Sequence, residues 1–495
     1  MSSVADTLTD AGHDVTMLMP VIDVSQRGRT GLKSTKKQIF VEADELVKEE
    51  FAKTTEFLTN LWTIDTSSPV MTWWNSGALN TLFGAQCNKV MQSKDLLEKL
   101  KAENFDLAIM EPFDGCAYGV VEYLQIPAHV SVLSCSRMDH SSYIIGQPIA
   151  PSYVPGMQSV YGDRMTITER FMNVLHVLSG HFMFTVIADN EFENAKKYLG
   201  IERSWRETLP ESSFFLTNHI PILDFPAPKL DKILPIGGLA VNTDRKNMEL
   251  THMMDTMLGM RKKNVLISFG TNIKSMDMPE EFKIAIVGLI KSMPDTSFIW
   301  KYENLAEKTH FCDCLNINRV EWIPQTELLA DSRVNAFITH GGLASVTELA
   351  MMGKPAVVIP IFADQTRNAE MLKRHGVAEV LHKSDLNNTK AMEHALRKVM
   401  EDESYRKNAE RLSEMLNNQP TNTKETLIKH VEFAARFGKL PSMDPYGRQQ
   451  TFIEYYLLDI IAIAITALFV ILFVSFKVIS FFFGKCCRRD KVKFE

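Results

Sequence analysis

Short runs of apolar residues alternate with longer amphipathic stretches along most of the chain. In the first half the runs predict strands at 14–18, 105–110 and 128–134, and the longer stretches predict helices at 3–11, 70–100, 118–124 and 165–200. In the second half the runs predict strands at 265–271, 297–302, 319–323, 334–339, 355–360 and 377–381, separated by helices such as 279–293. Strands that alternate with helices indicate α/β architecture with a doubly wound parallel sheet.

A loop-forming stretch divides this pattern into two regions. Between about 222 and 262, prolines and the segment IGGLAVNTDRKN interrupt the periodicity, as in a linker. We therefore predict a Rossmann-like domain over 1–245 and a second over 246–440, which includes a closing helix at 423–437 that stops at Gly438. Two such domains joined by a linker face each other across a cleft, a usual place for a ligand.

The C-terminal segment has the composition of a membrane anchor. Residues 457–483 are almost entirely apolar, with Asp459 near one end and Lys477 towards the other, and about 20 apolar residues in a helix span a bilayer core. The basic tail 484–495 is placed in the cytosol by the positive-inside rule, with the body across the membrane. The tail ends in KVKFE, whose lysines resemble a dilysine retrieval signal of the endoplasmic reticulum, although two lysines in a basic tail also occur by chance.

The N-terminal residues bear on the same question. MSSVADTLTDAGHDVTML lacks the apolar core of a signal peptide, so we expect either a missing start or insertion by the tail with a cytosolic body, and we favour the first. Asn387, in Asn-Asn-Thr, is a glycosylation sequence, and a glycan there would show that the body is lumenal.

Charge and cysteine content exclude other classes of protein. Lysine and arginine total 54 against 60 acidic residues, so no positive surplus is present and we expect no nucleic-acid partner. The seven cysteines are too few and too scattered for a disulfide framework, and Cys312 and Cys314 lack the second ligand pair of a zinc site. Cys486 and Cys487 form either a plain juxtamembrane pair or a palmitoylation site.

Candidate chemistry follows the strands of the second region, because ligands of open α/β sheets bind at the carboxyl ends of the strands. The strand 334–339 is followed by His340, Gly341 and Gly342, and then by a helix whose free N–H groups attract an anion. This arrangement predicts a diphosphate site. It has no G-x-G-x-x-G sequence, which argues against a nicotinamide or flavin cofactor.

Polar residues on that helix and after neighbouring strands complete the predicted site. Gly341, Ser345 and Glu348 share one face of the helix, where the Glu348 carboxylate can accept hydrogen bonds from ribose hydroxyls. Asp364 and Gln365 follow the strand 355–360 and can bind sugar hydroxyls or, alternatively, cap the next helix. Two residue pairs follow two further strands: Trp322 and Gln325, suited to stack on a base and read its edge, and Gly270 and Thr271.

The stretch 337–365 reads FITHGGLASVTELAMMGKPAVVIPIFADQ and resembles the signature of the UDP-glycosyltransferase family, of the UDP-glucuronosyltransferase kind. The segments WIPQ, ISFGT and GHDVT and the terminal anchor extend the resemblance over nearly the whole chain. It implies a GT-B fold of two Rossmann-like domains, with the acceptor in the N-terminal domain and a UDP-sugar in the C-terminal domain. It also implies a metal-free, inverting displacement of UDP by an acceptor hydroxyl, with no cofactor besides the UDP-sugar co-substrate.

The resemblance assigns roles to the predicted site residues. It implies that His340 and Thr271 contact the diphosphate, Glu348 the ribose, Trp322 and Gln325 the uracil, and Asp364 and Gln365 the sugar. Lys301 lies where relatives often carry an arginine near the donor.

The chain departs from the family pattern in two places. Ala344 stands where vertebrate relatives often carry asparagine. The chain also opens inside the helix that leads into GHDVT, so we expect the preceding strand and its acceptor-deprotonating histidine to be absent, and His13 to be structural. Glu111 occupies the position of that histidine's carboxylate partner, and Asp114 is a weaker candidate.

Three hypotheses follow. The first is an endoplasmic-reticulum enzyme that transfers glucuronic acid from UDP-glucuronate, or glucose from UDP-glucose, to small lipophilic acceptors. The Met- and Phe-rich helices at 70–100 and 165–200 suit either a core or a pocket for such acceptors. The second is an impaired family member that binds the same ligands without turnover, and the third, an oxidoreductase, is disfavoured by the glycine pattern. A homo-oligomer is compatible with all three.

Overall fold

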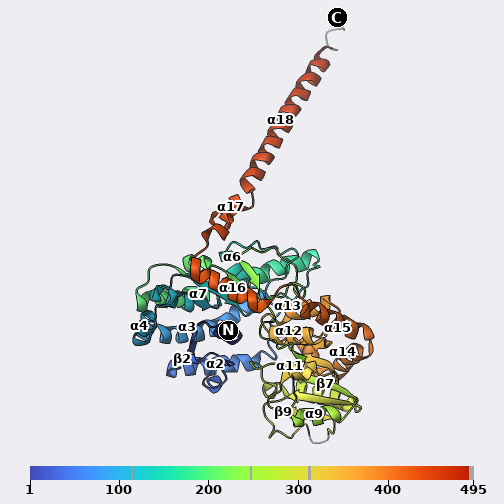
Figure 1. Cartoon of the computed structure of the whole chain (residues 1–495). Helices are drawn as coiled ribbons and strands as arrows, with labels where there is room; N and C mark the ends of the chain where they lie inside the picture. The colour runs from blue at the N-terminus through green and yellow to red at the C-terminus, as the bar shows by residue number, and fades with distance from the viewer. Residues whose placement is uncertain (114, 246–247, 310, 312–313, 490–495) are drawn as a thin grey trace. The chain divides into compact units, whose positions relative to one another are not determined.

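The computed structural model describes residues 1–113, 115–245, 248–309, 311 and 314–489. Residues 1–443 form one compact unit and the chain from Asp444 onward forms a second (Figure 1). The first unit contains two α/β regions, as the sequence predicts.

The first region contains two separate groups of parallel strands. One group pairs β1 (Thr16–Pro20) with β2 (Lys37–Val41), and the other has the order β3 (Ala108–Met110), β4 (His129–Leu133), β5 (Phe215–Thr217), β6 (Ile233–Pro235). The helices are α1 (Ser2–Asp10), α2 (Glu45–Asn60), α3 (Pro69–Gln92), α4 (Lys94–Ala102), α5 (Cys116–Leu124), α6 (Asp139–Ile144), α7 (Ile167–Leu199) and α8 (Trp205–Thr208). The predicted strands and helices are therefore confirmed. A cavity of about 330 Å³ is lined by residues of both β1 and β3.

Three strands and a disulfide correct the sequence interpretation. β2 and β5 were not predicted, and β6 lies inside the stretch interpreted as a linker. β6 is the outermost strand of its group, where a residue without an N–H group, such as Pro235, is tolerated. Cys87 on α3 and Cys116 at the start of α5 form a single disulfide, a pair that was not predicted. Their separation of 29 residues hides this contact from the sequence.

The second region contains one parallel sheet in the order β12–β11–β10–β7–β8–β9. Its strands are β7 (Lys263–Ser268), β8 (Thr296–Lys301), β9 (Ile317–Val320), β10 (Val334–Thr339), β11 (Ala356–Val358) and β12 (Ala378–Val380). Its helices are α9 (His252–Gly259), α10 (Glu280–Ser292), α11 (Gln325–Ala330), α12 (Leu343–Met352), α13 (Gln365–Arg374), α14 (Thr389–Glu401) and α15 (Glu403–Asn417). All six predicted strands are confirmed.

The apolar strands of this sheet are buried on both faces. Leu266 and Phe337 pack into one hydrophobic cluster, while the next residues along the chain, Ile267 and Ile338, pack into another. Because successive side chains of a strand point to opposite faces, the two clusters are the cores on the two sides of the sheet. The continuous apolar runs in the sequence follow from this burial.

Several segments pack against the region to which they do not belong in sequence. Helix α16 (Thr423–Phe437) buries Leu427 and Val431 among residues of α1 and β4 in the first region. Conversely, Trp62, just after α2, is buried in the core of the second region, with its ring 5.2 Å from that of Phe269. The Nζ atom of the buried Lys383 donates to Leu61 O at 2.9 Å. The loop after α2 is therefore anchored in the second region.

The second unit contains the short helix α17 (Phe452–Tyr455) and the long helix α18 (Leu458–Arg489). Residues Leu458–Phe483 of α18 are long and apolar enough to cross a membrane, and none of this segment is buried within the protein. Helix α7 meets the same criteria of length and composition, but it is nearly half buried. The predicted C-terminal anchor therefore forms the expected helix.

Candidate functional site

The tip of β10 and the start of α12 form the predicted anion site. Gly341 has a φ angle of +85°, and a Cβ atom there would lie 2.8 Å from Val358 Cγ1, so this position requires glycine. Gly342 is the N-cap of α12, and no described side chain caps the helix. The first N–H groups of α12 are thus directed at the strand tips with the partial positive charge of a helix N-terminus.

His340 and Lys301 lie beside this helix start. Cβ atoms on Gly270 and Gly342 would approach the His340 ring to 2.7 and 2.6 Å, so the ring lies against both glycines. Burial, together with the charge of Lys301, lowers the pKa of His340 to about 4, so the imidazole is neutral at pH 7. Lys301 Nζ donates to Gly270 O at 2.8 Å and forms an ion pair with Glu303 at 2.8 Å. A neutral imidazole and a cation therefore adjoin the helix N-terminus.

A second cluster joins α11 to α12. Gln325 Nε2 donates to Ser345 Oγ at 3.0 Å and to Glu348, while Thr326 Oγ1 donates to Glu348 Oε1 at 2.9 Å. Burial raises the pKa of Glu348, and these hydrogen bonds partly oppose the rise. Trp322 is 58% exposed, with Lys301 Nζ 5.7 Å from its ring centre. The indole of Trp322 is therefore exposed beside the cation of Lys301, and the carboxylate of Glu348 is held by two polar neighbours on α11.

Asp364 and Gln365 lie between β11 and α13. Asp364 is the N-cap residue of α13, but no cap bond from its side chain is present in the described structure, so the alternative role of helix cap is not realised. Its carboxylate accepts from Asn368 Nδ2 at 2.9 Å, and burial raises its pKa. Asn368 also donates to Gly341 O at 3.1 Å and so joins this turn to the anion site. Gln365 Oε1 accepts the N–H of Ile361 at 2.8 Å.

The first region contributes Glu111 and lines most of an apolar cavity. Glu111 follows β3, and its Oε1 accepts the N–H of Ser134 at 2.9 Å and also the Ser134 hydroxyl. Buried Cys135 has its pKa raised by burial, and the charges of Asp364 and Glu111 raise it further.

The cavity measures about 350 Å³. It is lined mainly by apolar side chains of α2, α3 and α7, together with residues of the loop before α13 and of the loop after β7: Phe51, Phe57, Leu58, Leu82, Phe83, Phe113, Met183, Phe184, Asn272, Phe362 and Ala363. Phe113 lies two residues after Glu111, and its ring packs edge-on against Phe184 with centres 4.9 Å apart. An apolar cavity therefore adjoins both regions.

Comparison with known proteins decides between the hypotheses of the sequence analysis. A family model described as "UDP-glucoronosyl and UDP-glucosyl transferase" matches residues 1–493. The chain belongs to this UDP-glycosyltransferase family. Human UDP-glucuronosyltransferase 1A8 is 27% identical over 504 residues, covering 100% of this chain and 91% of that protein. Human UDP-glucuronosyltransferase 1A1 is 27% identical over 497 residues, covering 98% and 89%. These matches give no support to the alternative of an impaired family member.

Solved structures show the fold. The glycotransferase of kitacinnamycin superposes with a TM-score of 0.56 at 15% identity, covering 90% of this chain and 94% of that one. The glycosyltransferase VinC, in complex with DTDP, gives 0.55 at 18% identity, covering 88% and 96%. The predicted GT-B fold is confirmed, and the apolar C-terminal helix of this UDP-glycosyltransferase is a candidate membrane span.

The structure brings most of the predicted donor residues of this UDP-glycosyltransferase together. Two groups form by direct contact: Gly270, Lys301, His340 and Gly342, and Gln325, Ser345 and Glu348. Thr271 is exposed at the same strand tip, and Asp114 lies outside the described residues. Sequence reasoning missed Asn368, although its spacing of four residues from Asp364 places both on one helix face. Among the described residues, no three His, Cys, Asp or Glu side chains converge as metal ligands would.

Proposed function

We propose that this family member transfers glucuronic acid or glucose from the UDP-sugar to a hydroxyl of a small lipophilic acceptor, with inversion. The observation that carries the proposal is the open N-terminus of α12 beside His340 and Lys301. A helix N-terminus and a nearby cation stabilise a diphosphate without a metal ion. As UDP leaves, the same groups stabilise the negative charge that develops on it.

The proposed donor pose distributes the rest of the molecule over the neighbouring strand tips. The uracil stacks on the exposed face of Trp322, the ribose hydroxyls donate to Glu348, and the sugar contacts Asp364 and Gln365. In support, Glu348 has both carboxylate oxygens oriented by Gln325 and Thr326, and Asp364 is oriented by Asn368. A buried carboxylate whose orientation is fixed in advance binds hydroxyls with little loss of entropy.

On the acceptor side, the apolar cavity suits a lipophilic aglycone, since a ligand of drug size fills a pocket of several hundred Å³. We propose that Glu111, two residues before the cavity residue Phe113, supports removal of the proton from the acceptor hydroxyl. A carboxylate alone is a weak general base for an alcohol hydroxyl at neutral pH. Its expected role is therefore to orient the group that takes the proton and to stabilise the positive charge that forms on that group.

We also propose that the body is lumenal in the endoplasmic reticulum. The disulfide Cys87–Cys116 suits an oxidising compartment, and the sequon residue Asn387 is exposed. Endoglycosidase treatment of the full chain should shift its mobility on a gel, and Asn387→Gln should abolish the shift. Without a shift in the wild-type chain, the lumenal placement is wrong.

Calorimetric titration of the detergent-solubilised chain with UDP tests the donor site. Turnover of UDP-glucuronate and UDP-glucose with a panel of phenols then tests the reaction, and the anomeric configuration of the product reports inversion. A chain that binds no UDP and converts neither donor with any phenol would refute the proposed function.

A further inference from the structure

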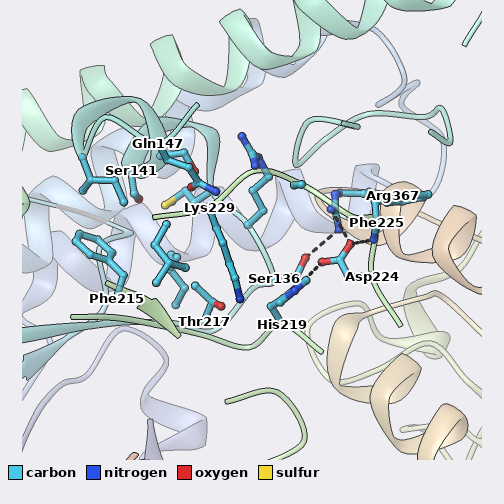
Figure 2. A pocket seen from close by; sticks show the side chains of 17 residues that line it. Ser136, Ser141, Gln147, Phe215, Thr217, His219, Asp224, Phe225, Lys229 and Arg367 are labelled. Atoms are coloured by element: carbon cyan, nitrogen blue, oxygen red, sulfur yellow. Dashed lines mark hydrogen bonds and ion pairs between the residues drawn. The ribbon is translucent and has the colours of Figure 1, made fainter. Parts of the chain in front are cut away.

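Arg367 is a buried arginine of the second, donor-binding region, and its side chain contacts the first, acceptor-binding region. It lies on α13, and its side chain is 2% exposed. Its NH2 group pairs with Asp224 Oδ1 at 2.7 Å, in the segment after β5, and Asp224 in turn contacts His219 Nδ1 at 2.9 Å. Figure 2 shows His219, Asp224 and Ser136 gathered around Arg367 beside a small cavity of about 60 Å³. The cation is therefore surrounded by the first region on several sides.

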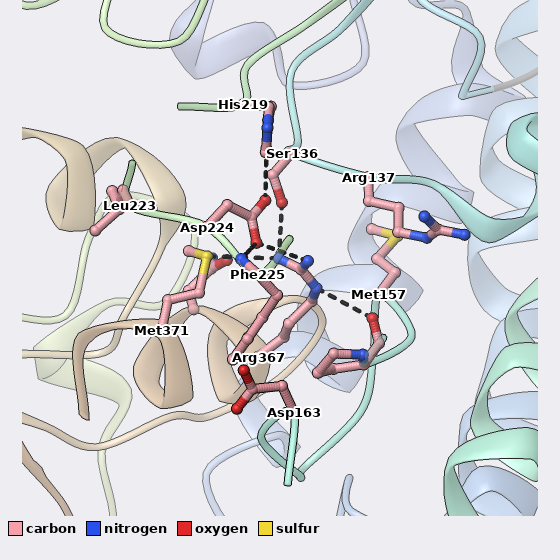
Figure 3. Close-up of polar contacts among 12 residues, drawn as sticks. Ser136, Arg137, Met157, Asp163, His219, Leu223, Asp224, Phe225, Arg367 and Met371 are labelled. Carbon is pink, nitrogen blue, oxygen red and sulfur yellow. Dashed lines mark hydrogen bonds and ion pairs between the residues drawn. The ribbon is translucent and has the colours of Figure 1, made fainter. Parts of the chain in front are cut away.

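Two further hydrogen bonds join the guanidinium to the first region. NH1 donates to Ser136 Oγ at 2.9 Å, and Nε donates to Pro155 O at 3.3 Å (Figure 3). Burial alone would raise the pKa of Asp224, but the charges of Arg367 and His219 hold it well below its ordinary value. The pair is thus ionised at neutral pH, and the planar fork of arginine contacts three separate segments of the acceptor region.

These contacts connect the two carboxylates of the active site. On the acceptor side, Ser136 lies two residues after Ser134, which donates its N–H and hydroxyl to Glu111. On the donor side, Arg367 lies three residues after Asp364, on the helix whose first residue is Gln365. One short path of hydrogen bonds and backbone therefore runs from Glu111 through Ser134, Ser136 and Arg367 to the residues proposed to hold the sugar.

We propose that Arg367 is a positioning residue for the transfer step. It fixes the start of α13, and with it the donor sugar, relative to the loop 134–136 that holds Glu111. This inference rests on the proposed function. A displacement of about 1 Å between reacting groups can lower a rate roughly a hundredfold. Loss of the Arg367 contacts would let the donor sugar shift relative to Glu111, and kcat would fall. UDP affinity stays nearly constant, because the proposed UDP contacts lie at the ends of β8, β9 and β10 and on α12, not on α13.

Arg367→Lys in the full chain tests the proposal. Lysine keeps a cation beside Asp224, but its single ammonium cannot contact Asp224, Ser136 and Pro155 O together. With UDP-glucuronate or UDP-glucose and 1-naphthol, we expect kcat to fall by about 10- to 100-fold while the Kd for UDP changes by less than about twofold. Ser136→Ala, which removes only the link to the acceptor loop, should lower kcat in the same direction by a smaller factor.

Arg374→Lys provides a matched control. Arg374 lies on the same helix, pairs with Asp163 at 2.9 Å across the same two regions, and makes no polar contact with the loop 134–136 among the described residues. We expect its kcat to remain within about twofold of the wild type.

If Arg367→Lys does not fold, Ser136→Ala alone decides the question. The proposal is overturned if Ser136→Ala leaves kcat unchanged, if Arg367→Lys and Arg374→Lys have equal effects, or if UDP affinity falls in parallel with kcat. A wild-type chain without UDP binding or turnover contradicts the proposed function instead.

Discussion

Glu348→Gln tests the proposed donor site most directly. In the structure Gln325 donates to one carboxylate oxygen of Glu348, and Thr326 Oγ1 donates to the other at 2.9 Å. A carboxylate offers about four lone-pair positions, so each oxygen keeps one for a ribose hydroxyl. Glutamine has nearly the same shape but replaces one acceptor oxygen with an NH₂ donor. One hydrogen bond from the ribose should therefore be lost.

The expected size of the effect follows from that count. A hydrogen bond to a charged group contributes about 1.5–3 kcal/mol, and 1.4 kcal/mol is a tenfold change in an equilibrium constant. We expect UDP affinity to fall by roughly 10- to 150-fold. Thermal stability should change little, because α12 packs into the core through Val346 and Leu349 on its other face.

The pH dependence of binding gives a second measure. Burial raises the pKa of Glu348 in the free protein, whereas hydroxyls of a bound ribose favour the ionised form and lower it. Binding therefore releases a proton, and UDP affinity should fall as the pH drops through the raised pKa. Glu348→Gln lacks this contribution, while titration of UDP itself is common to both proteins.

Calorimetric titrations with UDP between about pH 5 and pH 8 would measure both effects. Glu410→Gln, which removes an exposed carboxylate paired with Arg406, is the matched control. Binding by Glu348→Gln within twofold of the wild type, with the wild-type pH profile retained, would refute the assigned ribose contact.

Three other substitutions have distinct expected outcomes. Trp322→Ala should weaken UDP binding by about 5- to 150-fold through loss of about 1–3 kcal/mol of stacking, with pyrophosphate binding unchanged in competition titrations. Burial lowers the pKa of Lys383 to about 8 in the folded chain, against about 10.5 in the unfolded chain. Between about pH 8 and about pH 10.5 the unfolded chain therefore binds more protons, and the free energy of unfolding should rise with pH by up to about 3 kcal/mol. Lys383→Met should lack this rise in denaturant titrations. Replacing Cys87 and Cys116 by serine removes a cross-link between residues 29 positions apart and should lower the free energy of unfolding by about 3–4 kcal/mol. Thermal melting would measure this loss, and a reductant should destabilise the wild-type chain to the same extent.

The sequence predicts the second region better than the first for a physical reason. Strands buried on both faces are continuous apolar runs, and β10 occurs at the predicted residues 334–339. In the first region β5 and β6 are short strands, and β6 lies within a proline-rich stretch that resembles a linker. Pro235 further disguises β6, because proline is tolerated only at the edge position that the fold provides.

The candidate site divides in the same way. His340, Gly341 and Asp364 could be found because residues that follow parallel strands meet at one edge of a sheet. Arg367 could not be assigned a role, since its partner Ser136 lies 231 residues away along the chain. Contacts of that kind depend on how the two regions dock, which no local pattern encodes.

The buried indole of Trp62 has a consequence for exchanging parts between related enzymes. The wall of the acceptor cavity formed by α2 ends in a loop whose tryptophan completes the core of the other half of the protein, against Phe269. A hybrid that joins the first half of one relative to the second half of another transplants this side chain into a foreign core. Acceptor preference can therefore be moved intact only if the receiving half offers a cavity of the same shape.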